Sequence, residues 1–156
     1  MTGKIEITHN YFPQMGPELR READRLAGAT AFSILGHAQV AMAGPKHGRT
    51  YHIYSSPGIG TRVKRFLTGD RNLGARYVTH TASAPGEAPA VDTGALTASG
   101  YAKRLQFGTW EAGFTTQYAA ALEYGTPRIE PRPYLRPAVE AHRDGFMAAI
   151  RRLVGA

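Results

Sequence analysis

A long run of apolar residues at helical spacing, near the start of the chain, constrains the fold most. From Leu19 the apolar side chains recur every three or four residues and form one stripe over about seven turns. The members of the stripe are Leu19, Ala23, Leu26, Ala27, Thr30, Ile34, Ala38 and Ala41. Pro17 suits the first turn of a helix, and Gly44-Pro45 is a usual helix end. We therefore predict one long helix whose outward face carries Glu18, Arg20, Arg21, Asp24 and Arg25.

Length and composition indicate a single soluble domain. At 156 residues, with 42% apolar and 20% charged residues, the chain resembles ordinary globular proteins. No apolar run approaches the roughly 20 residues that cross a bilayer, and the N-terminus lacks the apolar core of a signal peptide. The absence of cysteine excludes disulfides and thiolate metal sites. We expect a protein that is made in the cytoplasm and does not enter a membrane.

The chain is basic, with 19 Lys and Arg against 12 Asp and Glu and a net charge of +7. Such a balance suits nucleic acid, an acidic membrane or an acidic protein surface. The basic residues are scattered, and no block of five or six marks a nucleic-acid tail. The pattern favours a solvated surface with general electrostatic attraction.

Local signals in the first two thirds of the chain predict strands and irregular segments. Residues 49–55 are rich in β-formers and predict a strand, and a second strand is expected at 75–81. The intervening residues 56–74, rich in glycine and basic residues, are interpreted as an inserted or extended loop. Residues 82–91 are small and polar and predict a flexible extended loop. Residues 1–13 form a short N-terminal arm.

The last third predicts a turn, a hairpin and two helices. Asp92-Thr93-Gly94 reads as a tight turn, and strands at 96–107 and 110–116 are joined through Gly108-Thr109. A short helix at 118–124 ends at Gly125, and a final helix covers 135–153. The order predicts an α+β fold for residues 14–156, in which the long N-terminal helix and the C-terminal helix pack on a small, mostly antiparallel sheet.

No catalytic or cofactor motif is recognisable. The six histidines include no H-x-x-x-H or H-E-x-x-H pair, so surface or structural histidines are favoured over a metal site. No G-x-S-x-G elbow occurs, and Gly58-Ile59-Gly60 lacks the Gly-Lys-Ser/Thr ending of a phosphate loop. Glu123 is a conceivable acid, but a salt bridge or hydrogen bond that fixes its turn explains it better. We predict no enzyme activity, no metal and no cofactor.

Three short segments in the last half follow one another in a specific order. They are Val91-Asp92-Thr93-Gly94-Ala95-Leu96, then Tyr118-Ala119-Ala120-Ala121-Leu122-Glu123-Tyr124-Gly125-Thr126, then Arg132-Pro133-Tyr134-Leu135-Arg136-Pro137-Ala138. In this order, and followed by a terminal helix, they resemble the tail-completion or neck-protein family of long-tailed bacteriophages. Members of that family help to join a DNA-filled head to a separately built tail. The resemblance covers roughly residues 83–153.

The resemblance implies a structural virion protein at the head–tail junction. Such a protein would be made in the host cytoplasm and would form a homo-oligomeric ring in the particle. Its partners would be neighbouring neck, connector or stopper proteins and tail-terminator or tail-tube proteins, with DNA in the channel as a further candidate. The signature positions would be Asp92, Thr93, Gly94, Leu96, Tyr118, Glu123, Tyr124, Gly125, Thr126, Arg132, Pro133, Tyr134, Arg136 and Pro137. We expect them mainly to fix the architecture.

Two features depart from the family pattern and define candidate contacts. Thr97 stands where a basic residue is common, and residues 56–74 look like an insertion. The basic residues of that insertion, as candidate partner or DNA contacts, are Arg62, Lys64, Arg65 and Arg71. The arms at 1–13 and 82–91 are expected to order on docking and to be protease-sensitive in the free protein.

Two other classes of function stay open at this point. A basic, non-sequence-specific nucleic-acid-binding module would use the positive charge and Tyr51, Tyr54 and Tyr77 on strands, where aromatic rings can stack on bases. Cross-strand packing explains these tyrosines equally well. A small hydrolase or nuclease is disfavoured, because neither paired carboxylates nor a metal constellation stands out.

Overall fold

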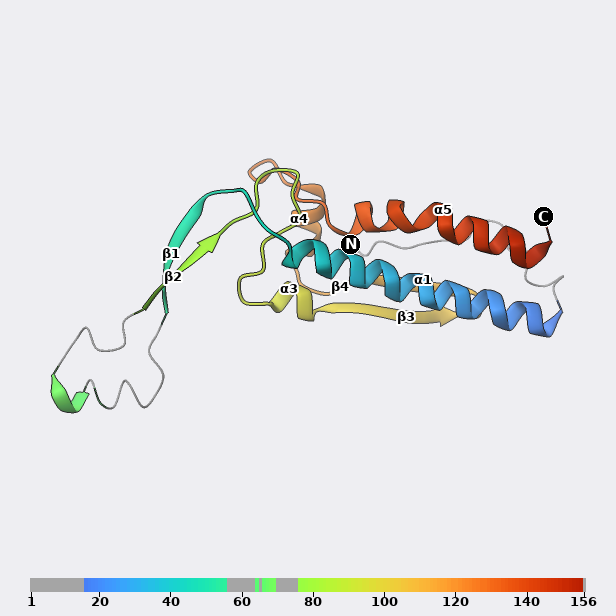
Figure 1. Ribbon diagram of the computed structural model, residues 1–156, viewed down its shortest axis with the longest axis horizontal. Helices are drawn as coiled ribbons and strands as arrows, with labels where there is room; N and C mark the ends of the chain where they lie inside the picture. Colours follow the sequence, from blue (N-terminus) through green and yellow to red (C-terminus); the bar gives the residue numbers. More distant parts are fainter. Residues whose placement is uncertain (1–15, 56–63, 65, 70–75, 156) are drawn as a thin grey trace.

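The computed structural model describes residues 16–55, 64, 66–69 and 76–155. It shows an elongated body of two long helices and a hairpin, from one end of which a two-stranded ribbon projects (Figure 1). The elements are α1 (Pro17–Ala43), β1 (Thr50–Ser55), β2 (Arg76–Thr81), α3 (Ala95–Ala98), β3 (Gly100–Gln106), β4 (Thr109–Phe114), α4 (Ala119–Tyr124) and α5 (Leu135–Val154). This is an α+β fold with long N-terminal and C-terminal helices, as predicted.

Helix α1 begins and ends where the sequence indicated, but its buried face is rotated. Pro17 lies in the first turn, and the backbone N–H of Gly44 donates to the carbonyl of Val40 at the end. The buried residues are Ala23, Ala27, Gly28, Ala31, Ile34, Leu35, Ala38 and Met42. Leu19, Leu26, Thr30 and Ala41, predicted to be in the stripe, are only partly buried. The face is rotated because α1 is covered by two neighbours, the β3–β4 hairpin and α5.

Asp24 lies on the packed side of α1, so its predicted outward position is wrong. Its Oδ1 accepts hydrogen bonds from the backbone N–H of Gly108 (2.8 Å) and from the indole N–H of Trp110 (3.2 Å). The guanidinium of Arg104 forms an ion pair with the same oxygen. One carboxylate therefore fastens the turn of the hairpin to α1. Gly28 permits this approach, because a Cβ there would lie 2.8 Å from the Trp110 ring.

The sheet consists of two separate antiparallel ribbons. Strands β3 and β4 pair from Gly100–Phe114 to Gln106–Thr109, with an irregularity between Arg104 and Gln106, and pack against α1. The prediction of a strand from residue 96 is wrong for its first residues, which form α3. Gly94 begins that helical turn with a positive φ of 76°, and the strand starts only at Gly100.

Strands β1 and β2 form the second ribbon, which leaves the body at the end opposite the C-terminus of α5 (Figure 1). Both predicted strands are confirmed, and each begins one residue later than expected. The antiparallel register pairs Thr50 with Thr81 at the base and Ser55 with Arg76 at the far end. The predicted insertion at 56–74 connects these strands. Within it, only Lys64 and residues 66–69 belong to the described part of the chain.

Residues 82–91 have no regular structure, as predicted, but they do not form a free arm. Ser83 and Pro89 are buried, and Ala88 packs against the core. The N–H of Gly86 donates to the carbonyl of Pro131 at 2.9 Å. The segment is thus fastened to the α4–α5 connection. The predicted N-terminal arm, 1–13, lies outside the described residues.

Helix α5 runs alongside α1 in the opposite direction (Figure 1). Its first turn is buried through Leu135 and Ala138. Further along the helix the partly buried residues include Val139, His142, Phe146 and Ile150. The rings of His37 and His142 meet edge to face, 5.4 Å apart, between the two helices. The outer face of α5 is charged, as expected for a surface helix.

Helix α1 is long and apolar enough to cross a membrane by length and composition alone, contrary to the expectation from the sequence. The core helix of a soluble domain meets the same criterion. Here α1 packs on both the hairpin and α5, and Ile34, Ala38 and Met42 are almost fully buried. This packing accounts for the apolar composition of its inner face.

Candidate functional site

The connection from α4 to α5 is organised by the carboxylate of Glu123. This side chain is buried, and it accepts three backbone hydrogen bonds from the start of α5. The donors are the N–H groups of Tyr134 (2.9 Å), Leu135 (2.9 Å) and Arg136 (2.8 Å). The first N–H groups of a helix have no partner within the helix, and its N-terminus favours a negative charge. Glu123 therefore caps α5 from another helix, since Tyr134 at the N-cap makes no side-chain capping bond.

This contact gives the predicted role of Glu123 a more specific form. A hydrogen bond does fix the turn, but its donors are backbone amides rather than an arginine side chain. The sequence indicates this cap from another helix only indirectly. The segment before α5 offers no Ser, Thr, Asp or Asn at the N-cap, which is occupied by Tyr134. A carboxylate from elsewhere supplies the missing acceptor.

Gly125 and Arg132 shape the chain between the two helices. Gly125 has a positive φ of 76°, and a Cβ there would lie 2.9 Å from the carbonyl oxygen of Ile129. Thr126 and Ile129 pair through two backbone hydrogen bonds and close a tight loop. The backbone N–H of Arg132 donates to the carbonyl of Leu122 at 2.7 Å. Glycine is required at residue 125 by conformation and by space.

Tyr134 joins this connection to the core. Its side chain is buried, its hydroxyl donates to the carbonyl of Ala119 at 3.2 Å, and its ring meets Phe114 edge to face at 5.1 Å. Burial, followed by the nearby charge of Glu123, raises the pKa of the Tyr134 phenol far above its usual value. The hydroxyl therefore stays protonated and serves as a hydrogen-bond donor.

The Asp92–Leu96 segment reaches the same core from the other side. Gly94 adopts the left-handed conformation, and the hydroxyl of Thr93 accepts a bond from the N–H of Ala95 at 3.3 Å. Asp92 and Thr93 are exposed, whereas Leu96 is buried in one cluster with Phe114, Tyr134 and Leu135. The structure thus brings together the inner members of motifs that lie about forty residues apart in the sequence.

The remaining signature residues lie around this cluster. Tyr118 and Tyr124, at the two ends of α4, are about half exposed, and Thr126 is exposed in the tight loop. Pro133 is partly buried, and Pro137 and Arg136 lie on the outer side of the first turn of α5. Of the predicted contact residues, Lys64 is exposed, and Arg62, Arg65 and Arg71 lie outside the described residues.

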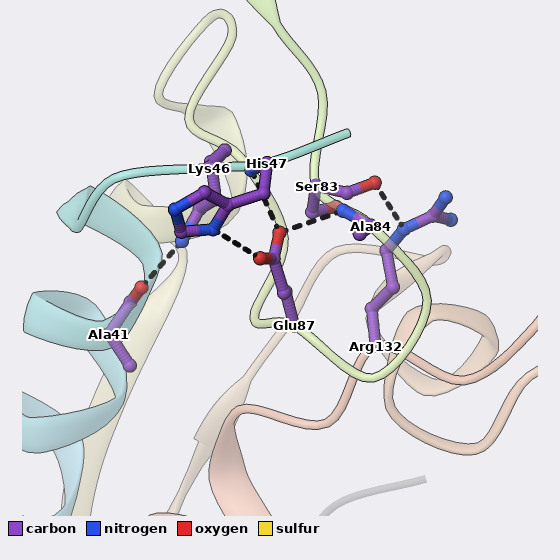
Figure 2. Close-up of polar contacts among 7 residues, drawn as sticks. All are labelled: Ala41, Lys46, His47, Ser83, Ala84, Glu87 and Arg132. Atoms are coloured by element: carbon purple, nitrogen blue, oxygen red, sulfur yellow. Dashed lines mark hydrogen bonds and ion pairs between the residues drawn. The ribbon is translucent and has the colours of Figure 1, made fainter. Parts of the chain in front are cut away.

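A second polar cluster fixes the base of the β1–β2 ribbon and is shown in Figure 2. Glu87 accepts hydrogen bonds from the backbone N–H groups of Ala84 (2.8 Å) and His47 (3.2 Å), and it contacts Nδ1 of the His47 ring at 2.7 Å. The amide of Ala84, followed by the ring and amide of His47, lowers the pKa of Glu87 to about 2. Next to this pair in the chain, backbone hydrogen bonds join Gly48 to Ala82 and Ala82 to Arg49.

The ribbon base and the α4–α5 connection are linked through Arg132. Its Nε donates to the carbonyl of Ser83 at 3.4 Å, while Lys46 donates to the carbonyl of Ala41 at the end of α1 (Figure 2). Gly48 is crowded, since a Cβ there would lie 2.5 Å from the carbonyl oxygen of Ala82. Sequence patterns could not reveal this cluster, because Glu87 and His47 come from segments 40 residues apart.

The described contacts of Glu123, Arg132 and Tyr134 hold elements of the fold together. Within the described ranges, no group of three or more His, Asp or Glu side chains lies close enough to hold a metal ion. A small hollow beside Glu123, lined by Phe114, Ala120 and Tyr124, has room for about one water molecule. The Glu123 carboxylate at its edge is already engaged by three amides.

Comparison of the chain with protein-family models, with curated proteins and with solved structures found no match.

Proposed function

We propose that this protein is a structural component of the head–tail junction of a long-tailed bacteriophage or a related particle. It joins the DNA-filled head to the tail through protein–protein contacts, as a subunit of a homo-oligomeric ring. Its neighbours are neck, connector or stopper, and tail-terminator or tail-tube proteins. The proposal rests on the ordered motifs of the last half of the chain and on what their residues do in the fold.

The observation that carries the proposal is the meeting of those motifs in one structural unit. Leu96 from the first motif packs in one cluster with Tyr134 and Leu135 from the third, and Glu123 from the second caps the helix that the third begins. The three segments that carry the resemblance therefore contribute to one part of the architecture. These contacts are what a motif that encodes one architecture would produce.

The outer face of α1 supports a role in protein–protein contacts. From Leu26 to Ala43 this helix contains no Lys, Arg, Asp or Glu, even at its exposed positions. Phe32 and Val40 are 56% and 71% exposed. Surface helices of monomeric proteins usually place charges on the outer face, as α5 does here. An uncharged outer face suits burial against a neighbouring subunit.

A complementation experiment tests the proposal. Heads and tails from a lysate that lacks this protein are mixed with the purified chain, and joined particles are counted by electron microscopy. The proposal predicts that wild-type protein restores joining. A variant with Val40→Glu on the outer face of α1 should fold but restore joining poorly. If wild-type protein leaves heads and tails apart while other neck proteins restore them, the proposal is wrong.

The alternative is a basic nucleic-acid-binding module that acts without a particle. It is favoured by one observation, the position of the positive charge in the fold, which is developed below. The head–tail joining assay distinguishes the two functions, because a free nucleic-acid-binding protein would be dispensable for joining heads to tails.

A further inference from the structure

The positive charge of the chain is concentrated in the β1–β2 ribbon and its connection. Residues 46–81 contain seven basic residues and a single acidic one, Asp70, so that this segment carries +6 of the net +7. The basic residues are Lys46, Arg49, Arg62, Lys64, Arg65, Arg71 and Arg76. The other 120 residues together carry only +1. The basic residues are separated along the sequence, yet the net charge outside this segment is close to zero.

The described part of the ribbon presents this charge along its length. Arg49 is exposed just before β1, and Lys64 is exposed in the short helical turn that contains residues 64 and 66–68; this turn lies beyond the ribbon, well away from the body (Figure 1). Lys46 lies between α1 and β1 and donates to the carbonyl of Ala41. His52 is also exposed. Among the described residues, no carboxylate pairs with Lys46, Arg49 or Lys64. The guanidinium of Arg49 lies over the ring of Tyr51, 5.5 Å from its centroid, and that ring is 45% exposed.

The far end of the ribbon also exposes two large apolar side chains. Phe66 is 87% exposed and Leu67 is 76% exposed, more than any other large apolar residue in the described part of the chain. Both follow Lys64 in a short helical turn. Exposed apolar side chains next to basic ones are costly in water and usually mark a contact surface.

We propose that the β1–β2 ribbon is an arm that binds duplex DNA without sequence specificity. A two-stranded β-ribbon fits a DNA groove, basic side chains along it neutralise phosphates, and apolar side chains at its end contact base steps. The exposed charge extends from Arg49 to Lys64, over a length that a polyanion can follow. A pocket on an acidic protein would require charge only at the far end. The other 120 residues, at +1, have no net negative charge that would attract the ribbon of a second copy.

The base of the ribbon is built to hold such an arm in one direction. Glu87 fastens His47 and Ala84 (Figure 2). A backbone hydrogen bond joins Gly48, the residue after His47, to Ala82. An arm that is fixed at its base loses less conformational freedom when it binds. This inference adds DNA as a partner and does not depend on the proposed place at the head–tail junction.

The test is binding of the purified full-length chain to a labelled duplex of about 30 base pairs over a series of salt concentrations. Each phosphate neutralised contributes about −0.9 to the slope of log K against log[salt]. We expect the double substitution Arg49→Gln/Lys64→Gln to reduce the slope by about 2 and to weaken binding about 10- to 100-fold at 0.1 M salt. Arg143→Gln/Arg151→Gln makes the same charge change on the outer face of α5 and should leave the slope unchanged.

The substitution Phe66→Ala/Leu67→Ala separates the apolar contact from the charge. Apolar contacts release no counterions, so binding should weaken at every salt concentration while the slope stays constant. Circular dichroism confirms that each variant is folded. No binding at low salt, or equal losses from the ribbon pair and the α5 pair, would overturn the proposal. Binding to anionic phosphatidylserine vesicles but not to duplex DNA would overturn it in favour of a membrane surface.

Discussion

The carboxylate of Glu123 and the backbone amide of Leu135 are joined by a buried hydrogen bond of 2.9 Å across the α4–α5 connection. Through this bond and two neighbouring ones, a residue of one helix supplies the N-terminal cap of another. The Glu123 side chain therefore fastens α4 directly to the first turn of α5. This explains why a motif in α4 and a motif at the start of α5 belong together.

Replacement of Glu123 should destabilise the protein strongly. Glu123→Ala removes the acceptor of three amides, two of them in buried bonds, and an unsatisfied buried polar group costs about 1–3 kcal/mol. We expect the free energy of unfolding to fall by about 2–4 kcal/mol. Urea denaturation measures it. Glu140→Ala, on the exposed face of α5, is the matched control and should change stability by less than about 0.5 kcal/mol. Equal losses in both variants would disprove the capping role.

Two glycines of α1 should respond in opposite ways to the same substitution. In Gly28→Ala the new Cβ would lie 2.8 Å from the Trp110 ring, so the hairpin must shift, at a cost of about 1–3 kcal/mol. In Gly36→Ala nothing lies within 4 Å, and the better helix propensity of alanine should stabilise by about 0.5–1 kcal/mol. Thermal denaturation of the two variants measures both changes in stability. A stabilised Gly28→Ala variant would contradict the packing of Trp110.

The Glu87 carboxyl should titrate well below its ordinary range. Its pKa is lowered from 4.5 to about 2, so the contribution of this group to stability is present above about pH 4.5 and is lost as the pH falls through about 2. NMR of the carboxyl carbon measures the midpoint. Because the Ala84 amide is the largest cause, the variant His47→Ala should keep a pKa below 4.5. A midpoint near 4.5 in the wild-type protein would show that the ribbon base is open in solution.

Residues 82–91 should resist proteolysis in the free protein, in contrast to what their composition suggests. The segment is held by the bond from Gly86 to Pro131 and by the Glu87 cluster. Glu87→Ala should make it a cleavage site, which mass spectrometry of the fragments after limited digestion would reveal. Asp92→Ala, at an exposed position just beyond the segment, is the control. Rapid cleavage of the wild-type protein within 82–91 would contradict the anchored segment.

The sequence predicts the elements that depend on local chemistry. The limits of α1 follow from Pro17 and Gly44, and the α4–α5 pair follows from apolar spacing and Gly125. The turn at Gly94 was also predicted, but the strand after it was not placed correctly. Leu96 lies in α3, which is a single turn. One turn is too short for a helical spacing of apolar residues to be recognised in the sequence.

The features that sequence reasoning missed arise from contacts between distant segments. Asp24 looks like a surface residue until the hairpin 84 residues later places Gly108 over it. Ser83 lies in a loop, as predicted, but its burial and the hydrogen bond that its carbonyl accepts from Arg132 were not predicted. The concentration of charge on the ribbon is hidden for the same reason. The seven basic residues are spread from Lys46 to Arg76, and only the pairing of β1 with β2 shows that Arg76 belongs to the same ribbon as the residues that follow Arg49.

The most direct test of the account is electron microscopy of particles from a lysogen that lacks this gene. We predict that DNA-filled heads and finished tails accumulate separately, and that joined particles return when the gene is supplied from a plasmid. Joined particles of normal appearance in the absence of the gene would contradict the role at the head–tail junction.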